Sequence, residues 1–169
     1  MKTIGIITNS DKDINFEFTK LVAGKIMELG GRVLMPHASA SKLDLEVEIL
    51  DENQIYKKSE CILSLGGDGT YLKVARKAYA ANVPILGINL GTLGFLTEIE
   101  KCDIDSTLHN ILNDRYTIEE RMMLETVIYD KNEVVAKDIA LNDVVISRGE
   151  LSRILHLKTY INKDRKSVV

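Results

Sequence analysis

One stretch decides the fold of this chain, and it reads Cys61-Ile62-Leu63-Ser64-Leu65-Gly66-Gly67-Asp68-Gly69-Thr70. An apolar run leads into the stretch, and residues 71–79 leave it with helical spacing, which predicts a strand, a tight turn and the start of a helix. The glycines Gly66, Gly67 and Gly69 let backbone N–H groups come close to a ligand, because no Cβ stands in the way. A helix N-terminus beyond the turn favours negative charge, so the turn is predicted to bind phosphate.

Asp68 is the unexpected member of this turn, because a carboxylate repels a phosphate unless it holds a metal or takes a proton. An alternative interpretation is that the turn only joins a strand to a helix, with Asp68 as the helix cap. Two common phosphate loops are excluded. The P-loop pattern needs a lysine that does not follow Gly69, and the dinucleotide fingerprint needs a third glycine where the chain has Leu72.

The composition limits the classes of partner. The chain of 169 residues carries a net charge of −3, which fits one domain or slightly more and a core that needs no disulfides. Without a basic block, we expect no nucleic-acid partner and no membrane surface as a partner. No apolar run is long enough to span a bilayer, and the start of the chain does not read as a signal peptide. Cys61 and Cys102 form no metal-like cluster with the three histidines, so we expect reduced thiols and a cytoplasmic protein.

Strands and helices alternate through the first half of the chain. The strand-like runs are residues 3–8, 32–35, 61–65 and 83–89, and the helix-like runs between them are residues 18–29, 52–60 and 71–81. Residues 36–51 show no clear pattern. The order predicts an α/β fold with a doubly wound parallel sheet. Ligands of such sheets collect outside the carboxyl ends of the strands, so Asn9, Gly66–Thr70 and Asn89–Phe95 are expected to gather at one edge.

The pattern changes after Leu96. One more helix is predicted at residues 103–113, and strands dominate from there: residues 124–129, 133–137, 139–146 and 154–161. The first two of these flank a hairpin signal at residues 130–132. We therefore divide the chain into an α/β domain, residues 1–115, and the start of an all-β second domain, residues 116–169. The last strand has no visible return strand, so we expect the chain to be a fragment with an incomplete second domain.

Two further motifs carry candidate binding residues. Asn89-Leu90-Gly91-Thr92-Leu93-Gly94-Phe95-Leu96 is a second glycine-bearing loop at a strand's carboxyl end, where Phe95 could stack on a base, cover a pocket or belong to the core. Asn142 and Asp143 precede an apolar run, and adjacent acceptors of this kind suit the two vicinal hydroxyls of a ribose. Ordinary turn chemistry is the alternative for that pair. Arg153 lies further on and could face an anionic ligand or water.

The three motifs together, Gly66–Thr70, Asn89–Leu96 and Leu141–Val145, resemble the NAD kinase family in order and in spacing. The resemblance covers essentially the whole chain. The Gly-Gly-Asp-Gly element alone is not specific, because diacylglycerol-type lipid kinases and phosphofructokinases also use it. Lipid kinases usually continue with an Asn-Glu pair, whereas this chain continues with Leu72-Lys73-Val74-Ala75.

The resemblance implies a function. Members of the family transfer the γ-phosphate of ATP, or sometimes of polyphosphate, to the 2′-hydroxyl of the adenosine ribose of NAD, which gives NADP. Asp68 is then the base for that hydroxyl. A divalent metal, expected to be Mg²⁺, offsets the triphosphate charge, although no residue of the chain is assigned as its ligand. The residues expected to bind the substrates are Gly66, Gly67, Asp68, Gly69, Lys73, Asn89, Phe95, Asn142, Asp143 and Arg153.

One departure from the family concerns the second domain. Members continue into a complete β-rich domain with a Thr-Pro-Thr-Gly-Ser-Thr-Ala-Tyr-like segment that lines the NAD site, and this chain lacks it. We therefore expect very weak activity from these residues alone, and NAD kinase activity from a full-length protein that is a homo-oligomer. Two alternatives stay open: a lipid or sugar kinase that shares the glycine turn, and a noncatalytic dinucleotide-binding module.

Overall fold

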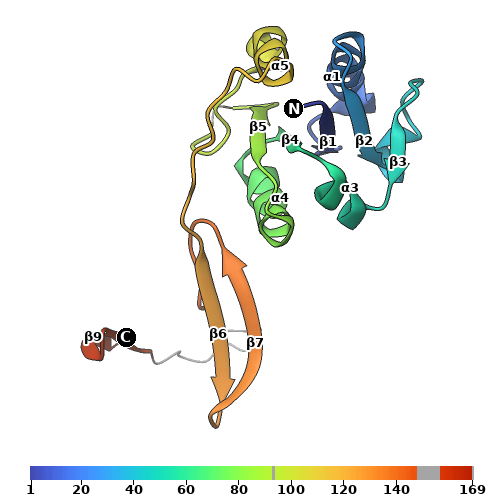
Figure 1. The fold of residues 1–169 in the computed structure, drawn as a ribbon. Helices are drawn as coiled ribbons and strands as arrows, with labels where there is room; N and C mark the ends of the chain where they lie inside the picture. Colours follow the sequence, from blue (N-terminus) through green and yellow to red (C-terminus); the bar gives the residue numbers. More distant parts are fainter. Residues whose placement is uncertain (93, 148–156, 169) are drawn as a thin grey trace.

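Five parallel strands form the central sheet, in the order β3-β2-β1-β4-β5 (Figure 1). They are β1 (Thr3–Thr8), β2 (Arg32–Pro36), β3 (Glu48–Leu50), β4 (Cys61–Gly66) and β5 (Ile85–Asn89). The computed structural model describes residues 1–92, 94–147 and 157–168. Every residue of β4 is buried, as expected of an apolar strand with a layer on each face.

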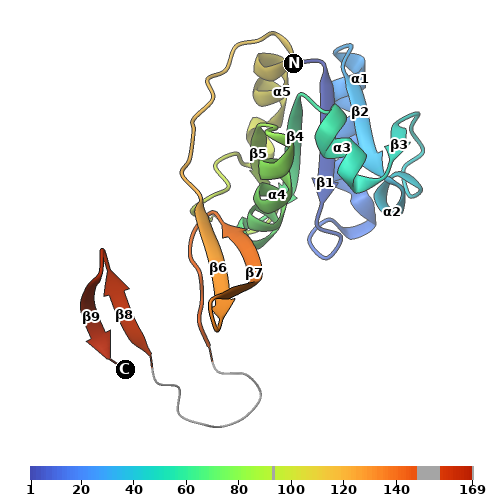
Figure 2. The same cartoon turned by 60° about the horizontal axis from the view of Figure 1, so that its bottom comes forward.

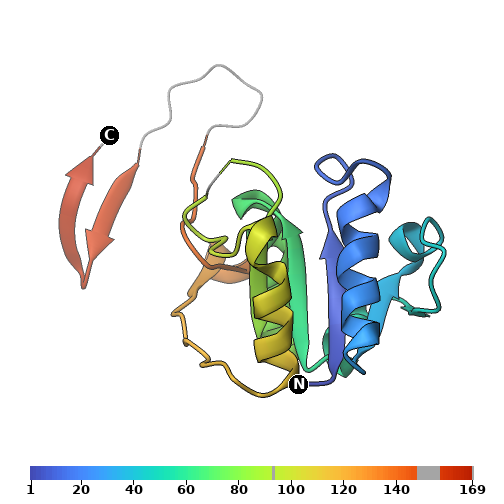
Figure 3. The same ribbon diagram turned by 90° about the horizontal axis from the view of Figure 1, so that it is seen from above.

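Helices cover both faces of the sheet (Figures 1 and 3). On one face lie α1 (Glu17–Glu28) and α5 (Ile104–Leu112), and on the other α3 (Glu52–Lys58) and α4 (Asp68–Ala81). Three short pieces complete the layers: a 3₁₀ turn η1 (Ile14–Phe16), the helix α2 (His37–Ala40) and a 3₁₀ turn η2 (Lys101–Asp103). The predicted doubly wound α/β sheet is thereby confirmed. No helix in the described ranges combines the length and apolarity needed to cross a bilayer.

The core divides into two clusters, one for each face. Leu63 and Leu65 pack in the cluster that also holds residues of α1 and α5, whereas Ile62 packs in the cluster with residues of α3 and α4. Successive residues of a strand point to opposite faces, so a single apolar strand supplies both layers. The run of apolar residues before the glycine turn is therefore what holds the two helix layers on one sheet.

The strand order creates a crevice at the carboxyl edge of the sheet. From β1 the chain moves outward on one side to β2 and β3, and it then returns to place β4 and β5 on the other side. The loops that follow β1 and β4 thus diverge from neighbouring strands to opposite faces. Ligand sites of doubly wound sheets form at this kind of switch point. The glycine turn follows β4, so the fold places it there.

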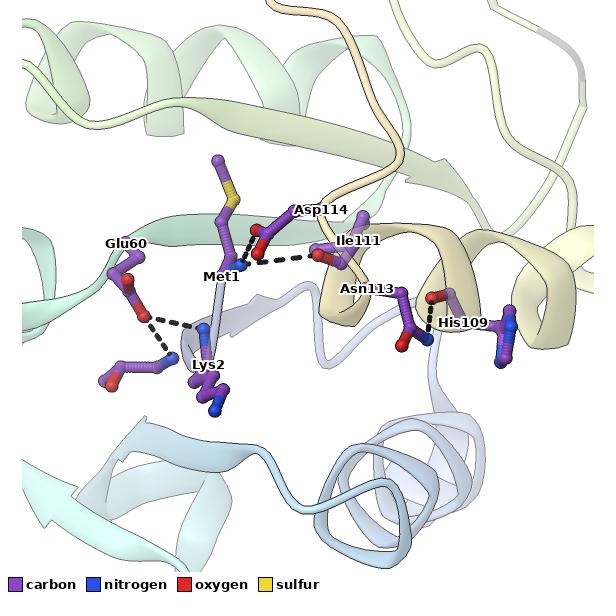
Figure 4. A network of polar contacts seen from close by, with 8 residues as sticks. Met1, Lys2, Glu60, His109, Ile111, Asn113 and Asp114 are labelled. Carbon is purple, nitrogen blue, oxygen red and sulfur yellow. Dashed lines mark hydrogen bonds and ion pairs between the residues drawn. The ribbon is translucent and has the colours of Figure 1, made fainter.

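The opposite edge of the sheet is closed by polar contacts around the N-terminus (Figure 4). The ammonium group of Met1 donates to the carboxylate of Asp114 at 2.5 Å and to the carbonyl of Ile111 at 3.4 Å. The carboxylate of Glu60 accepts the N–H groups of Lys2 and Thr3 at 2.6 and 2.7 Å, and these bonds lower its pKa. The contacts join the start of β1 to the end of α5 and to the residue before β4.

Two antiparallel hairpins follow the α/β layers. In the first, β6 (Leu124–Asp130) pairs with β7 (Glu133–Ala140), and the tight turn between them has positive φ at Lys131 and Asn132, as the hairpin signal predicts. Figure 2 shows this hairpin leaving the layers beside α4. An ion pair between Arg76 of α4 and Asp138 of β7 ties the two parts together. In the second hairpin, β8 (Lys158–Ile161) pairs with β9 (Asp164–Val168).

The hairpins correct two expectations from the sequence. The predicted strand at residues 139–146 is wrong, because Ile139 and Ala140 complete β7 and residues 141–147 form no strand. The last strand does have a return strand, since β9 follows it directly. The sequence analysis did not predict β9, because its residues Asp-Arg-Lys-Ser-Val are mostly polar and do not alternate between apolar and polar side chains. Residues 154–156 of the predicted run 154–161 lie outside the described ranges, and β8 begins at Lys158.

Two glycines in different surroundings predict opposite effects on stability. A Cβ on Gly5 in β1 would lie 2.5 to 2.7 Å from side-chain atoms of Ser59, Ile62 and Ile55, because α3 packs directly on β1 at this point. Gly5→Ala should therefore reduce the free energy of unfolding by about 1–3 kcal/mol, the cost of overpacking. Gly24 in α1 has open space around it. Gly24→Ala should raise the free energy of unfolding by about 0.5–1 kcal/mol.

Urea unfolding of both variants measures the two effects against the parent chain. No loss of stability in Gly5→Ala would contradict the packing of α3 against β1, and a loss in Gly24→Ala would contradict the open space around that residue of α1.

Candidate functional site

The glycine turn joins β4 to α4 at the switch point. Gly66 ends β4 and lies opposite Asn89 of β5, and Gly67 is the N-cap of α4. A Cβ on Gly66 would lie 2.4 Å from the hydroxyl of Thr70, so this glycine lets the first turn of α4 fold back onto the strand. A Cβ on Gly69 would meet nothing within 4 Å. Packing therefore explains Gly66, whereas Gly69 faces open space where a ligand can approach.

Asp68 is the first residue of α4, and its carboxylate reaches across to the loop after β5. One oxygen, Oδ2, accepts the N–H of Phe95 at 2.8 Å. The other, Oδ1, accepts the N–H groups of Leu96 and Thr97 at 3.1 and 3.3 Å and the Thr97 hydroxyl at 3.3 Å. Neither oxygen caps α4, whose N-cap residue Gly67 makes no side-chain bond. The interpretation of Asp68 as a helix cap is therefore wrong.

Gly94 makes this contact possible. A Cβ at Gly94 would lie 2.1 Å from Oδ1 of Asp68, closer than two atoms can approach without a shift. Asn89 shapes the same loop from inside, because its Oδ1 accepts the N–H of Gly91 at 2.9 Å and its Nδ2 donates to the carbonyl of Thr92 at 2.8 Å. Asn89 is buried. Its amide thus holds the loop in a form that presents backbone N–H groups to Asp68.

The hydrogen bonds keep Asp68 ionised. The bond from the Phe95 N–H is the largest influence and lowers the pKa of the carboxyl. Desolvation comes second and raises it, and the bonds from Leu96 and Thr97 lower it further, so the pKa is lowered overall. A carboxylate in the first turn of a helix also gains from the helix dipole. At neutral pH the site therefore contains a fixed negative charge beside the glycine turn.

The ring of Phe95 lies outside the protein core. Its side chain is 98% exposed, although its own N–H is bonded to Asp68. The interpretation of Phe95 as ordinary core is therefore wrong. A fully exposed aromatic ring whose backbone is anchored to Asp68 offers a flat apolar surface, which suits a base or another ring.

The loop after β1 brings Lys12 to the glycine turn, a residue that the three motifs did not identify. Asn9 belongs to the same loop. Asn9 donates its N–H to the carbonyl of Leu65 at 2.9 Å and its side-chain amide to Thr70 at 3.1 Å, so the loop is joined to both sides of the glycine turn. The ammonium group of Lys12 lies 2.6 Å from the place that a Cβ on Gly67 would take. The available signal was positional: a polar loop at the carboxyl end of β1, which is the neighbour of β4 in the sheet.

Lys73 lies in a different place. It lines a hollow of about 310 Å³ between α3, α4 and the loop after β1, together with Asn9, Thr70 and Lys77. The ammonium of Lys77 is paired with Glu52 of α3 at 2.7 Å. Lys73 therefore faces the side of α4 that is turned toward α3. A nucleotide would reach it only by extending past Thr70.

The predicted ribose residues come from the segment that follows β7. Asn142 and Asp143 are exposed and follow β7, and no hydrogen bond within the described ranges connects them to Asp68. Arg153 lies outside the described residues. The structure therefore brings together the predicted residues of the glycine turn, Asn89 and Phe95, whereas Asn142 and Asp143 belong to the segment that follows β7.

The described residues do not form a cage for a metal ion. No group of three His, Cys, Asp or Glu side chains suited to a metal occurs in the parts of the chain that are described. The oxygens of Asp68 already accept four hydrogen bonds, three of them on Oδ1.

Comparison with known proteins assigns the family. A model of the ATP-NAD kinase N-terminal domain matches residues 4–116. The chain belongs to the NAD kinase family. The NAD kinase of Acetivibrio thermocellus is 46% identical over 162 residues, which cover 96% of this chain and 56% of that protein. The NAD kinase of Ruminiclostridium cellulolyticum is 43% identical over 166 residues, which cover 97% of this chain and 57% of that protein.

A solved structure agrees in fold. Yeast NADH kinase, crystallised in complex with NADH, matches 99% of this chain with a TM-score of 0.82 and 20% identity, and the match covers 55% of that chain. The chain thus spans little more than half the length of the NAD kinase family members that it matches. The resemblance read from the three motifs is confirmed, and it separates this chain from the lipid and sugar kinases that share the glycine turn.

The lowered pKa of Asp68 predicts a pH dependence of stability. A carboxyl whose folded pKa lies below its ordinary value of 3.8 stabilises the fold above that value, and the contribution disappears as the pH falls through the folded pKa. Asp68→Asn removes the charge but keeps the shape. The difference in free energy of unfolding between parent and variant should therefore be full at pH 7 and shrink below about pH 4. Urea unfolding across this pH range measures it. Parallel profiles would contradict the hydrogen bonds to residues 95–97.

Proposed function

We propose that the protein to which this chain belongs is an NAD kinase that transfers the γ-phosphate of ATP to the 2′-hydroxyl of the adenosine ribose of NAD. In this step the ribose oxygen forms a bond to the γ-phosphorus, the bond from that phosphorus to the bridging oxygen breaks, and ADP leaves. The hydroxyl proton passes to a carboxylate and then to water. The observation that carries the proposal is the ionised Asp68, which is bonded to the loop of residues 94–97 at the carboxyl edge of the sheet. The chain that contains it belongs to the NAD kinase family.

Asp68 has one oxygen with room for a substrate. Oδ2 accepts a single hydrogen bond, from Phe95, whereas Oδ1 accepts three. A carboxylate oxygen has two lone pairs, so Oδ2 can accept one further bond from a ribose hydroxyl. A lowered pKa makes Asp68 a weak base for a free alcohol. Phosphoryl transfer has a loose transition state in which positioning and charge compensation dominate, so a weak base that orients the hydroxyl is sufficient.

The remaining assignments follow from the motifs. We place the donor phosphates against the backbone of Gly66, Gly67 and Gly69, with Asn89 holding the neighbouring loop. The exposed ring of Phe95 supports a contact with the adenine of NAD. The residues assigned to NAD on the second part of the chain are Asn142, Asp143 and Arg153. Lys73 is kept as a weaker candidate for the nucleotide, because it lines the hollow beyond Thr70.

Further parts of the proposal concern the whole protein. ATP enters as its complex with a divalent cation, with Mg²⁺ the expected ion and polyphosphate an alternative donor. We propose that the chain divides into an α/β domain, residues 1–115, and the start of a β-rich domain, residues 116–169. The full-length protein is a homo-oligomer, and the 169 residues alone have very weak activity. The cytoplasm is the proposed location. It is supported by the free thiols of Cys61 and Cys102, and burial raises the pKa of the Cys61 thiol to about 12.

Substitution of the proposed base tests the mechanism. In the complete gene product, Asp68→Asn should lower kcat at least about a hundredfold, the contribution of a general base, because the amide cannot accept the ribose proton. NAD binding should persist, since other residues hold that substrate. NADP formation from ATP, Mg²⁺ and NAD gives kcat, and calorimetric titration with NAD gives the affinity. Unchanged turnover would remove Asp68 from the mechanism.

Asn142 tests the placement of NAD. Asn142→Ala should weaken NAD binding about two- to tenfold, the range of a single hydrogen bond of about 0.5–1.5 kcal/mol. Asn110→Ala on the exposed side of α5 is the matched control and should leave NAD binding unchanged. If Asn142→Ala lowers the melting temperature and leaves NAD affinity intact, the residue serves the turn after β7 and not the ligand.

A further inference from the structure

Lys12 extends over the glycine turn from the loop that follows β1. Its Nζ atom lies 2.6 Å from the position of a Cβ on Gly67 and 3.3 Å from that of a Cβ on Gly91. These two glycines belong to different loops, one after β4 and the other after β5. The ammonium group therefore occupies a space that two missing side chains leave open, between the two loops that Asp68 also joins.

The backbone of Lys12 is fixed on both sides. Its own N–H donates to the carbonyl of Asn9 at 3.2 Å. On the other side Asp13 is buried, and its carboxylate accepts the N–H of Phe18 at 3.0 Å and both the N–H and the hydroxyl of Thr19 at 2.8 and 2.5 Å. Asn9 is bonded in turn to Leu65 and Thr70. The side chain thus starts from an anchored loop, which limits where its ammonium can go.

The charge of Lys12 has no counterion in the described parts of the chain. The ion pairs recorded there involve other lysines, such as Lys25 with Asp105 and Lys77 with Glu52. Lys12 and Asp68 form no ion pair with each other either. The groups that lower the pKa of Asp68 are the N–H groups of the loop and the Thr97 hydroxyl. A positive group beside the glycine turn, with its backbone anchored and with no ion-pair partner among the described residues, is suited to bind an anionic ligand.

We propose that Lys12 binds the terminal phosphates of the phosphate donor. This inference rests on the proposed function, and it adds a residue that the three motifs do not include. A phosphate that approaches the N–H groups of Gly67 and Gly69 at the start of α4 comes within reach of the ammonium. The positive charge offsets the repulsion between that phosphate and the Asp68 carboxylate. Because the contact is with phosphate oxygens, it serves ATP and inorganic polyphosphate alike. NAD also carries phosphates, but the proposal assigns the glycine turn beside Lys12 to the donor, so the affinity for NAD should not depend on Lys12.

The first test separates the two substrates. In the complete gene product, Lys12→Met should raise the KM for ATP about ten- to hundredfold, the range of a charge-assisted hydrogen bond, and leave the KM for NAD unchanged. The affinity for inorganic tripolyphosphate should fall by a similar factor, and Lys12→Arg should restore part of it. The ratio between parent and variant should shrink at high salt, because salt screens an exposed charge. Lys20→Met, on the exposed side of α1, is the matched control and should change neither KM.

The second test is a double-mutant cycle with Gly67. This residue has a φ of −143°, an extended conformation that alanine adopts without strain, and the added Cβ would meet only Lys12. Gly67→Ala should therefore raise the KM for ATP in the parent and have little further effect beside Lys12→Met. Additive effects would contradict the placement of the Lys12 ammonium against Gly67, because each residue would then act on the phosphate independently.

The outcomes also separate this inference from the proposed function. A parent protein that makes no NADP from ATP and NAD would refute the function and, with it, a donor site at Lys12. A parent that makes NADP, with a Lys12→Met variant whose KM for ATP is unchanged, would overturn the role of Lys12 and leave the function intact.

Discussion

The carboxylate of Asp68 binds the backbone of residues 95–97, and the shape of the site depends on this contact. It joins the turn after β4 to the loop after β5 at the edge where the two parallel strands end. The contact needs Gly94, because any side chain there would collide with Oδ1. It also needs Asn89, which folds the loop from inside. One acid thus joins the two loops and places a negative charge between them.

The sheet and the place of the site could be predicted from the sequence, because both follow from patterns that are local in the chain. Continuous apolar runs such as Ile62–Leu65 predict strands buried on both faces, and helical spacing between them predicts the covering layers. The carboxyl edge then follows from topology. The glycine turn and the loop that begins at Asn89 are found there for that reason.

Other features depended on contacts between distant residues, which no local pattern contains. The partners of Asp68 lie 27 to 29 positions further along the chain, so the sequence could not distinguish a helix cap from a link between loops. Lys12 lies beside the turn because β1, which precedes its loop, is the neighbour of β4 in the sheet. Lys73 was predicted because it is close to the turn in sequence, but it lines the hollow beside α3. The strand β9 was missed because five largely polar residues carry no alternation.

The two charged groups of the crevice are kept apart by the backbone, and this separation decides what the site can do. An ion pair between Lys12 and Asp68 would satisfy both charges and leave little reason for an anion to bind. The loop of residues 95–97 instead satisfies Asp68 with neutral donors, while Gly67 and Gly91 leave space for the ammonium of Lys12. Under the function and the lysine role that we propose, a phosphate meets a positive group on one side while the hydroxyl that attacks it meets a negative one on the other. Neutral donors lower the pKa of the carboxyl without consuming the lysine, so both charges remain available when the substrates arrive.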